Sequence, residues 1–96
     1  MRRVELLRVK IRVDGLVQGV GFRYFIWRHA RSLGLTGFVK NMYDGSVLIV
    51  AEGDRESVEK LIELARRGPP AAIVENIDIQ YEEPKKEFTT FFINYD

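Results

Sequence analysis

The stretch LRVKIRVDGLVQGVGFRYFIWRHARSLG, residues 7–34, decides the fold of this chain. Apolar and charged residues alternate over residues 7–14, and this two-residue period predicts a strand with one buried face. Three glycines then fall within residues 15–21, which indicates a loop. Over residues 22–33 the apolar side chains recur at helical spacing, and Gly34 lies where a left-handed residue would end the helix. The stretch therefore predicts a strand, a glycine-rich loop and an amphipathic helix in succession.

Outward from this stretch, apolar periodicity and turn residues predict the other elements. They are a short strand at 36–41, a buried strand at 47–51, a helix that starts after Asp54, a strand at 73–82 and a last short strand at 91–95. Both amphipathic helices and the alternating strands bury their apolar sides if the helices share one face of an antiparallel sheet. We therefore predict a ferredoxin-like α+β sandwich of βαββαβ order, to which residues 91–95 could add a short C-terminal strand.

Composition restricts the classes of protein that this chain can belong to. Its 96 residues suit a single domain over 1–96, and 15 Lys and Arg against 14 Asp and Glu leave a net charge of +1. That balance gives no electrostatic reason to bind nucleic acid or an anionic membrane. The absence of cysteine excludes disulfides and thiolate chemistry, and His29 is the only histidine. Because charges interrupt the apolar run after the basic N-terminus, no signal peptide or membrane span of about 18 residues is predicted, and we expect a cytoplasmic protein.

Backbone N–H groups make the glycine-rich loop the main candidate for anion binding. Glycine lets successive N–H groups turn toward one point, where they and a helix N-terminus can hold an anion without any charged side chain. The N–H groups predicted to form this cradle are those of Gln18, Gly19, Val20, Gly21 and Phe22. Arg23 follows in the first helical turn, where its charge is unfavourable for the helix dipole, which suggests an anion nearby. Neither the P-loop nor the dinucleotide fingerprint fits, because Gly-Lys does not occur and Tyr24 replaces the third glycine.

Asn41 ends the predicted strand at 36–41, just before a turn at Asp44-Gly45. Its carboxamide both donates and accepts hydrogen bonds and does not change charge with pH, so it can position a water without removing a proton. Taken alone, Asn41 is more often a turn former and Arg23 more often a solvated helix residue. The joint spacing of the two motifs is what favours a functional site.

Together, GLVQGVGFR at 15–23 and GFVKNMYDGSV at 37–47 resemble the motifs of the acylphosphatase family. The resemblance covers nearly the whole chain in length, element order and both motifs. It implies an enzyme that hydrolyses acyl phosphates to a carboxylate and inorganic phosphate. By position, Arg23 would bind the phosphate and Asn41 would orient the attacking water. Phe38 departs from the family, which usually has tryptophan there, and we expect only a difference in packing.

The chemistry that the resemblance implies requires little of the protein. The leaving carboxylate has a conjugate acid with a pKa of about 4, so no general acid is needed. What remains is to neutralise the phosphoryl oxygens and to place a water in line, which is positioning and electrostatics. We therefore expect no metal and no cofactor, with a small-molecule acyl phosphate as substrate. Inorganic phosphate would be both product and competitive inhibitor, and a monomer is the default at this size.

Three other interpretations compete with this one. The first is a non-catalytic phosphate-binding regulatory domain that uses the same cradle. The second is the start of a larger carbamoyl-phosphate-handling maturation protein, but those continue into cysteine-rich zinc-binding segments, and the lack of cysteine favours a free-standing enzyme. The third is an RNA-binding module, which the charge balance and the absence of an RNP motif disfavour. His29 lies on the apolar stripe of the first helix, so we expect a partly buried, hydrogen-bonded histidine without a catalytic role.

Overall fold

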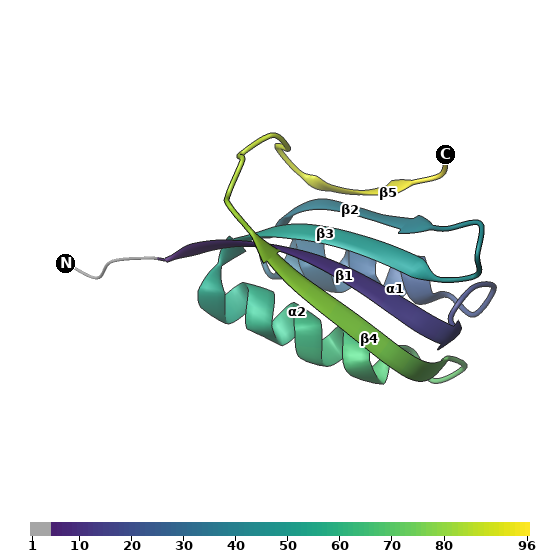
Figure 1. Ribbon diagram of the computed structural model, residues 1–96. Helices are drawn as coiled ribbons and strands as arrows, with labels where there is room; N and C mark the ends of the chain where they lie inside the picture. Colours follow the sequence, from purple (N-terminus) through teal and green to yellow (C-terminus); the bar gives the residue numbers. More distant parts are fainter. Residues whose placement is uncertain (1–4) are drawn as a thin grey trace.

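Five strands form one sheet in the computed structural model, which describes residues 5–96 (Figure 1). In chain order the elements are β1 (Leu6–Leu16), α1 (Phe22–Ser32), β2 (Thr36–Asn41), β3 (Val47–Asp54), α2 (Arg55–Arg67), β4 (Ile73–Glu82) and β5 (Phe91–Asn94). Across the sheet the strand order is β4-β1-β3-β2-β5. The predicted ferredoxin-like α+β fold is confirmed, including the extra C-terminal strand. The start of the basic N-terminal segment, residues 1–4, lies outside the described residues.

The sheet is mixed, and the expectation of a purely antiparallel sheet is wrong for its last strand. The pairs β1–β3, β1–β4 and β2–β3 are antiparallel, whereas β5 pairs with β2 in parallel. Strand β4 ends opposite the start of β1, at the same end of the sheet where β2 begins. The segment at 83–90 therefore only has to cross that end, and β5 then runs in the direction of β2 (Figure 1).

Strand β1 continues past the point where its glycines predicted a loop. It runs through Gly15 to Leu16 because β4 remains paired with it, across a register shift after Asp14. The loop that leads into α1 is therefore shorter than predicted, and it begins at Val17.

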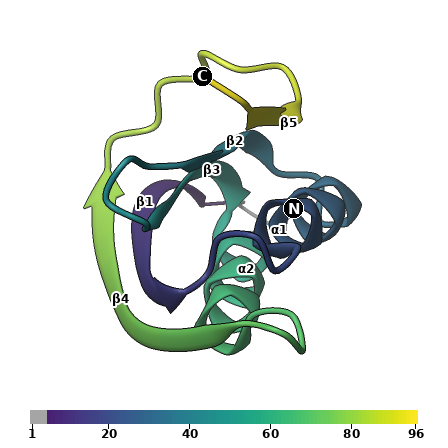
Figure 2. The ribbon, with the colours of Figure 1, turned by 90° about the vertical axis from the view of Figure 1, so that its right-hand side faces the viewer.

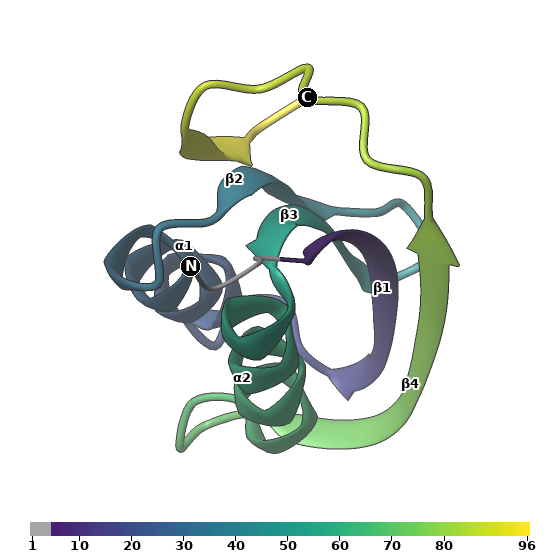
Figure 3. The same ribbon diagram turned by 90° about the vertical axis from the view of Figure 1, so that its left-hand side faces the viewer.

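Both helices pack on the concave face of the sheet, as predicted (Figure 3). Their ends follow the sequence signals: Asp54 caps α2 by accepting a hydrogen bond from Ser57 N at 2.8 Å, and Gly34 has a φ of 74° just after α1. The core between helices and sheet is built from alternate strand residues and one stripe of each helix, among them Val9, Ile11, Val13, Phe22, Ile26, Ala30, Ile49, Val58, Leu61 and Ala65. Helix α1 and strand β2 pack side by side against this core.

The opposite face of the sheet carries a buried ion cluster around Arg8. Its guanidinium donates to Glu52 at 3.3 Å, to Glu82 at 3.0 Å and to Glu87 at 2.6 Å. The Glu52 carboxylate also accepts hydrogen bonds from the backbone N–H groups of residues 85–86, at 3.0 and 2.8 Å. The cluster therefore fastens the 83–90 segment, which delivers β5, to the centre of the sheet.

We predict that Glu52→Gln lowers the free energy of unfolding by about 1–3 kcal/mol at pH 7, because it weakens hydrogen bonds to a charged group that is nearly buried. Burial by itself raises the pKa of Glu52, but the N–H groups of residues 85–86 and Arg8 more than offset it and lower the pKa from its ordinary 4.5. A lowered pKa stabilises the fold above the unfolded-state value, and this contribution is lost as pH falls through the folded-state value. The difference in the free energy of unfolding between wild type and Glu52→Gln should therefore become smaller below about pH 4.

Urea denaturation at several pH values measures this difference. The matched control is Glu59→Gln, because Glu59 is an exposed carboxylate on α2 whose ion-pair partner among the described residues is Arg55, four residues earlier, at 3.4 Å. We expect it to change stability by less than about 0.5 kcal/mol. Equal denaturation midpoints for wild type and Glu52→Gln at pH 7 would contradict the role of the cluster.

Candidate active site

A tight loop at 17–21 joins β1 to α1 at the end of the sheet where the β2–β3 turn and the C-terminus also lie (Figures 1 and 2). Gly19 and Gly21 have φ values of 76° and 80°, in the left-handed region that favours glycine. A Cβ at either position would meet no atom within 4 Å, so the backbone angle and not space requires glycine there. The glycines that predicted a loop here are therefore required by its backbone conformation.

Helix α1 begins without a cap. Gly21 occupies the N-cap position, no side chain accepts a hydrogen bond there, and the first turn has no acidic residue. Within residues 5–96, no hydrogen bond is donated by the backbone N–H groups of residues 18–24. Free N–H donors together with the positive end of the helix dipole favour an anion at this point.

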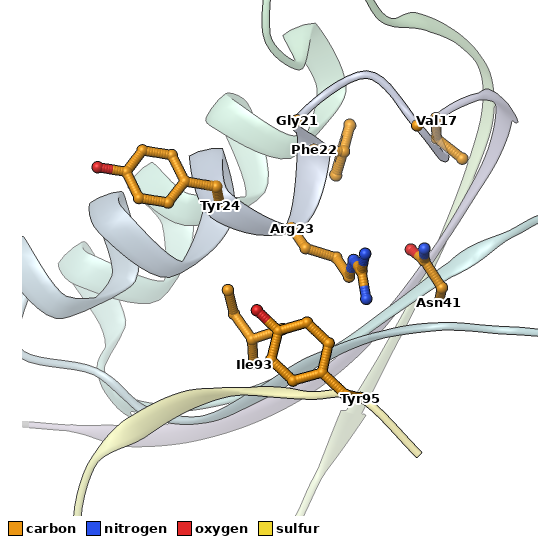
Figure 4. A pocket seen from close by; sticks show the side chains of 9 residues that line it. Val17, Gly21, Phe22, Arg23, Tyr24, Asn41, Ile93 and Tyr95 are labelled. Atoms are coloured by element: carbon orange, nitrogen blue, oxygen red, sulfur yellow. The ribbon is translucent and has the colours of Figure 1, made fainter.

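Arg23 and Asn41 face one cavity beside this helix end (Figure 4). The cavity measures about 190 Å³ and is lined by Val17, Gly19, Gly21, Phe22, Arg23, Tyr24, Asn41, Ile93 and Tyr95. The Arg23 side chain reaches from the first turn of α1 toward Asn41 at the end of β2. Its guanidinium carbon lies 5.1 Å from the centre of the Tyr95 ring, which holds the cation over the cavity.

The Asn41 side chain has a buried oxygen without a partner. Among the described residues, Oδ1 of Asn41 is the buried side-chain polar atom that makes no hydrogen bond. Leaving such an acceptor unsatisfied costs about 1–3 kcal/mol, so the position favours a bound group that can donate a hydrogen bond. A site that combines this acceptor with Arg23 and free N–H donors suits an oxyanion together with a water molecule.

The predicted cradle residues do not all line the cavity. Gly19, Gly21 and Phe22 line it, and the Phe22 side chain is buried in the core, so this residue can offer only its backbone N–H. Gln18 and Val20 belong to the same loop but are not among the lining residues. The Gln18 side chain instead turns to the β2–β3 turn.

Ile93 and Tyr95 are lining residues that the sequence did not indicate. Sequence reasoning assigned both to the short C-terminal strand by their alternation alone. They reach the cavity because β5 pairs with β2 far away in sequence, placing Ile93 opposite Val39. No local signal could have found them.

His29 does not line the cavity, and its predicted partial burial is confirmed, whereas its side chain makes no hydrogen bond within residues 5–96. It is half-buried on α1, and its ring centre lies 4.7 Å from that of Phe25. Burial foremost, and then the charges of Arg28 and Arg67, lower its pKa below the ordinary 6.5. In the described part of the chain, His, Asp and Glu side chains form no group of three or more that could hold a metal ion. None of the helices in residues 5–96 is long and apolar enough to cross a membrane.

Comparison with known proteins places this chain in a family. The acylphosphatase family model matches residues 9–93. An acylphosphatase of Caldivirga maquilingensis is 53% identical over 91 residues, which make up 94% of this chain and 96% of that protein. The crystal structure of an acylphosphatase from Bacillus subtilis is 39% identical and superposes with a TM-score of 0.89, over 93% of this chain and 99% of that one.

The same fold also occurs within a larger protein. The structure of T. kodakarensis HypF superposes on 94% of this chain with a TM-score of 0.79 at 37% identity, but the match covers 12% of that chain. Since the family model spans most of the sequence, the chain belongs to the acylphosphatase family, and the resemblance seen in its two motifs is confirmed.

Proposed function

We propose that this cavity binds the phosphoryl group of an acyl phosphate and hydrolyses it without a metal, with Arg23 and Asn41 as the catalytic residues. Membership of the family makes the chain an acylphosphatase, an enzyme that hydrolyses carboxyl-phosphate anhydrides. One observation carries the assignment of roles. Arg23 and Asn41, whose buried Oδ1 has no hydrogen-bond partner, line the same cavity beside an uncapped helix N-terminus.

Arg23 and the loop N–H groups account for phosphate binding. A guanidinium can donate two parallel hydrogen bonds to phosphoryl oxygens. Gly19 and Gly21 have positive φ angles, and backbone N–H groups of a loop in this conformation can donate to the same phosphoryl group. These donors stay in place as charge develops on the phosphoryl oxygens during transfer. Fixed donors of this kind stabilise the transition state more than water does.

Asn41 accounts for the attacking water. Beside an anion, an acceptor such as Oδ1 can be satisfied only by a group with hydrogens, and a water molecule is such a group. The water oxygen forms the new bond to phosphorus while the bond from phosphorus to the acyl oxygen breaks, and the acyl carboxylate leaves with that electron pair. Both hydrogens of the water end on inorganic phosphate. Because the leaving group is a carboxylate, no side chain has to supply or remove a proton.

We propose that the enzyme acts as a monomer, which is the default for a single domain of 96 residues. We also propose a location in the cytoplasm and a small molecule as partner, since a net charge of +1 gives no electrostatic reason to bind nucleic acid or an anionic membrane. Tyr24, Ile93 and Tyr95 line the cavity beside the phosphate site, so the acyl group would meet a mostly apolar wall.

Hydrolysis of acetyl phosphate in excess chelator tests the proposal. We expect saturable release of phosphate that chelator does not diminish and that inorganic phosphate inhibits competitively. We also expect kcat to change less than about twofold between about pH 6 and pH 8, because neither an arginine nor an asparagine changes its charge there. His29→Ala, the matched control, should follow the same profile.

Three results would contradict the proposal. Phosphate binding without hydrolysis would identify the regulatory domain that uses the same cradle. Loss of turnover in chelator, restored by a divalent cation, would show a metal-dependent mechanism. A change in kcat with pH near the ordinary pKa of histidine, absent in His29→Ala, would show that His29 takes part in catalysis.

A further inference from the structure

We propose that the side chain of Gln18 is a positioning residue that holds the phosphate-binding loop at a fixed distance from Asn41. The inference rests on the proposed roles of Arg23 and Asn41, and it assigns Gln18 a task different from the backbone role predicted for it. Its side chain does not line the cavity, so it acts through its neighbours and not on the substrate.

Two short hydrogen bonds join Gln18 to the β2–β3 turn. Its Nε2 donates to the carbonyl oxygen of Met42 at 2.8 Å and to that of Ser46 at 2.9 Å. Both partners can only accept, so the atom between them must be the amide nitrogen with its two hydrogens. Among the common side chains, a primary amide is suited to satisfy two carbonyl groups in this way, and Gln18 is partly buried between them.

The turn that Gln18 holds is itself closed by its own hydrogen bonds. Met42 N donates to Ser46 O at 2.9 Å, and Asp44 Oδ1 accepts from Ser46 Oγ at 2.6 Å and from Ser46 N at 3.0 Å. Arg12 on β1 pairs with the other Asp44 oxygen at 2.7 Å. These hydrogen bonds close residues 42–46 into one compact turn, and Asn41 is covalently attached to its first residue. A bond to this turn fixes Asn41 as well.

Within residues 5–96, no hydrogen bond other than these two from Gln18 links residues 17–24 with residues 41–46. Arg23 lies in the first of these segments and Asn41 in the second. Without the link, the distance between bound phosphate and positioned water would be set by packing and by the pairing of β1 and β2 with β3, which stops before the loop begins. An error of about 1 Å in such a geometry can reduce a rate by about 10²-fold, so a reaction by in-line attack depends on this distance.

Two variants with nearly the same shape test the proposal. In Gln18→Met the side chain keeps its length but has no donor, and in Gln18→Glu a carboxylate faces two carbonyl oxygens. We expect kcat for acetyl phosphate to fall about 10- to 10²-fold in both, while the inhibition constant of inorganic phosphate stays within about threefold of wild type. The matched control is Tyr43→Ala, in the same turn, because the Tyr43 side chain is fully exposed. It should keep wild-type kcat.

The pH profile of Gln18→Glu separates positioning from a general loss of structure. When the introduced carboxyl group is protonated, it regains one O–H donor for a carbonyl oxygen, so the kcat of this variant relative to wild type should rise as pH falls below about 4.5. Gln18→Met has no titrating group and should show no such rise. A merely structural role would lower the activity of both variants without this difference.

Wild-type kcat in Gln18→Met would overturn the proposal, as would a rise in the phosphate inhibition constant proportional to the loss of kcat. If Gln18→Glu does not fold, Gln18→Met and its phosphate inhibition constant still decide the question. Failure of the underlying roles looks different, because Arg23→Ala and Asn41→Ala would then retain turnover. Inactive Arg23 and Asn41 variants beside fully active Gln18 variants would reject the positioning role alone.

Discussion

Replacing Arg23 with alanine is expected to lower kcat/KM for acetyl phosphate by about 10³-fold or more. Arg23 is the only charged residue among those that line the cavity in the described part of the chain. Its removal leaves only backbone N–H groups to balance the charge of a doubly charged phosphoryl group. A single arginine that contacts a transferring phosphoryl group raises kcat by about 10³- to 10⁵-fold. Because the guanidinium binds phosphate before and during the reaction, the inhibition constant of inorganic phosphate should rise as well.

Steady-state hydrolysis and phosphate inhibition measure this effect. Arg23→Lys keeps the charge but loses the planar pair of donors, so it should fall between wild type and Arg23→Ala. Arg28→Ala is the control for loss of a positive charge from α1, because Arg28 is exposed and does not line the cavity. The free energy of unfolding of Arg23→Ala should differ from that of wild type by only about 1 kcal/mol, because the interaction lost is the contact of Arg23 with the Tyr95 ring. Turnover by Arg23→Ala at the wild-type rate would remove Arg23 from the mechanism.

Replacing Asn41 with alanine is expected to lower kcat by about 10²- to 10³-fold, in the range found when one positioned side-chain amide is removed from an active site. Here the phosphate inhibition constant should stay close to wild type, since Asn41 is proposed to hold the water and not the anion. The variant should also remain folded, because no hydrogen bond of the Asn41 side chain within the described residues is lost.

Asn41→Asp distinguishes the water from the phosphate. It keeps the shape and the acceptor but adds a negative charge to the cavity, so phosphate inhibition should weaken, in contrast to Asn41→Ala. If Asn41→Ala instead weakens phosphate inhibition and leaves kcat unchanged, Asn41 is a ligand of the anion and the attacking water must be held elsewhere. The comparison of kcat with the inhibition constant therefore assigns one task to each of the two residues.

Much of this protein could be predicted from local signals. Alternation over residues 7–14 and the helical spacing over 22–33 predicted β1 and α1, and Asp54 and Gly34 lie at helix ends as their residue types indicated. The motifs at 15–23 and 37–47 brought Arg23 and Asn41 forward as site residues, and the structure places both at one cavity. The predictions of the elements and of the helix ends are confirmed, because backbone preference and periodic burial depend on near neighbours in the chain. The roles of Arg23 and Asn41 remain predictions.

Other features depend on contacts that no local pattern encodes. The sequence by itself determined the two helices, the strands, the left-handed loop and the residue types of the site. Only the tertiary structure decided the parallel pairing of β5, the place of Tyr95 beside Arg23, the cluster around Arg8 and the link from Gln18 to the β2–β3 turn. A periodic pattern specifies which side of a strand is buried but not which strand lies next to it. Hydrogen bonds between distant segments therefore become visible only when the order of the sheet is known.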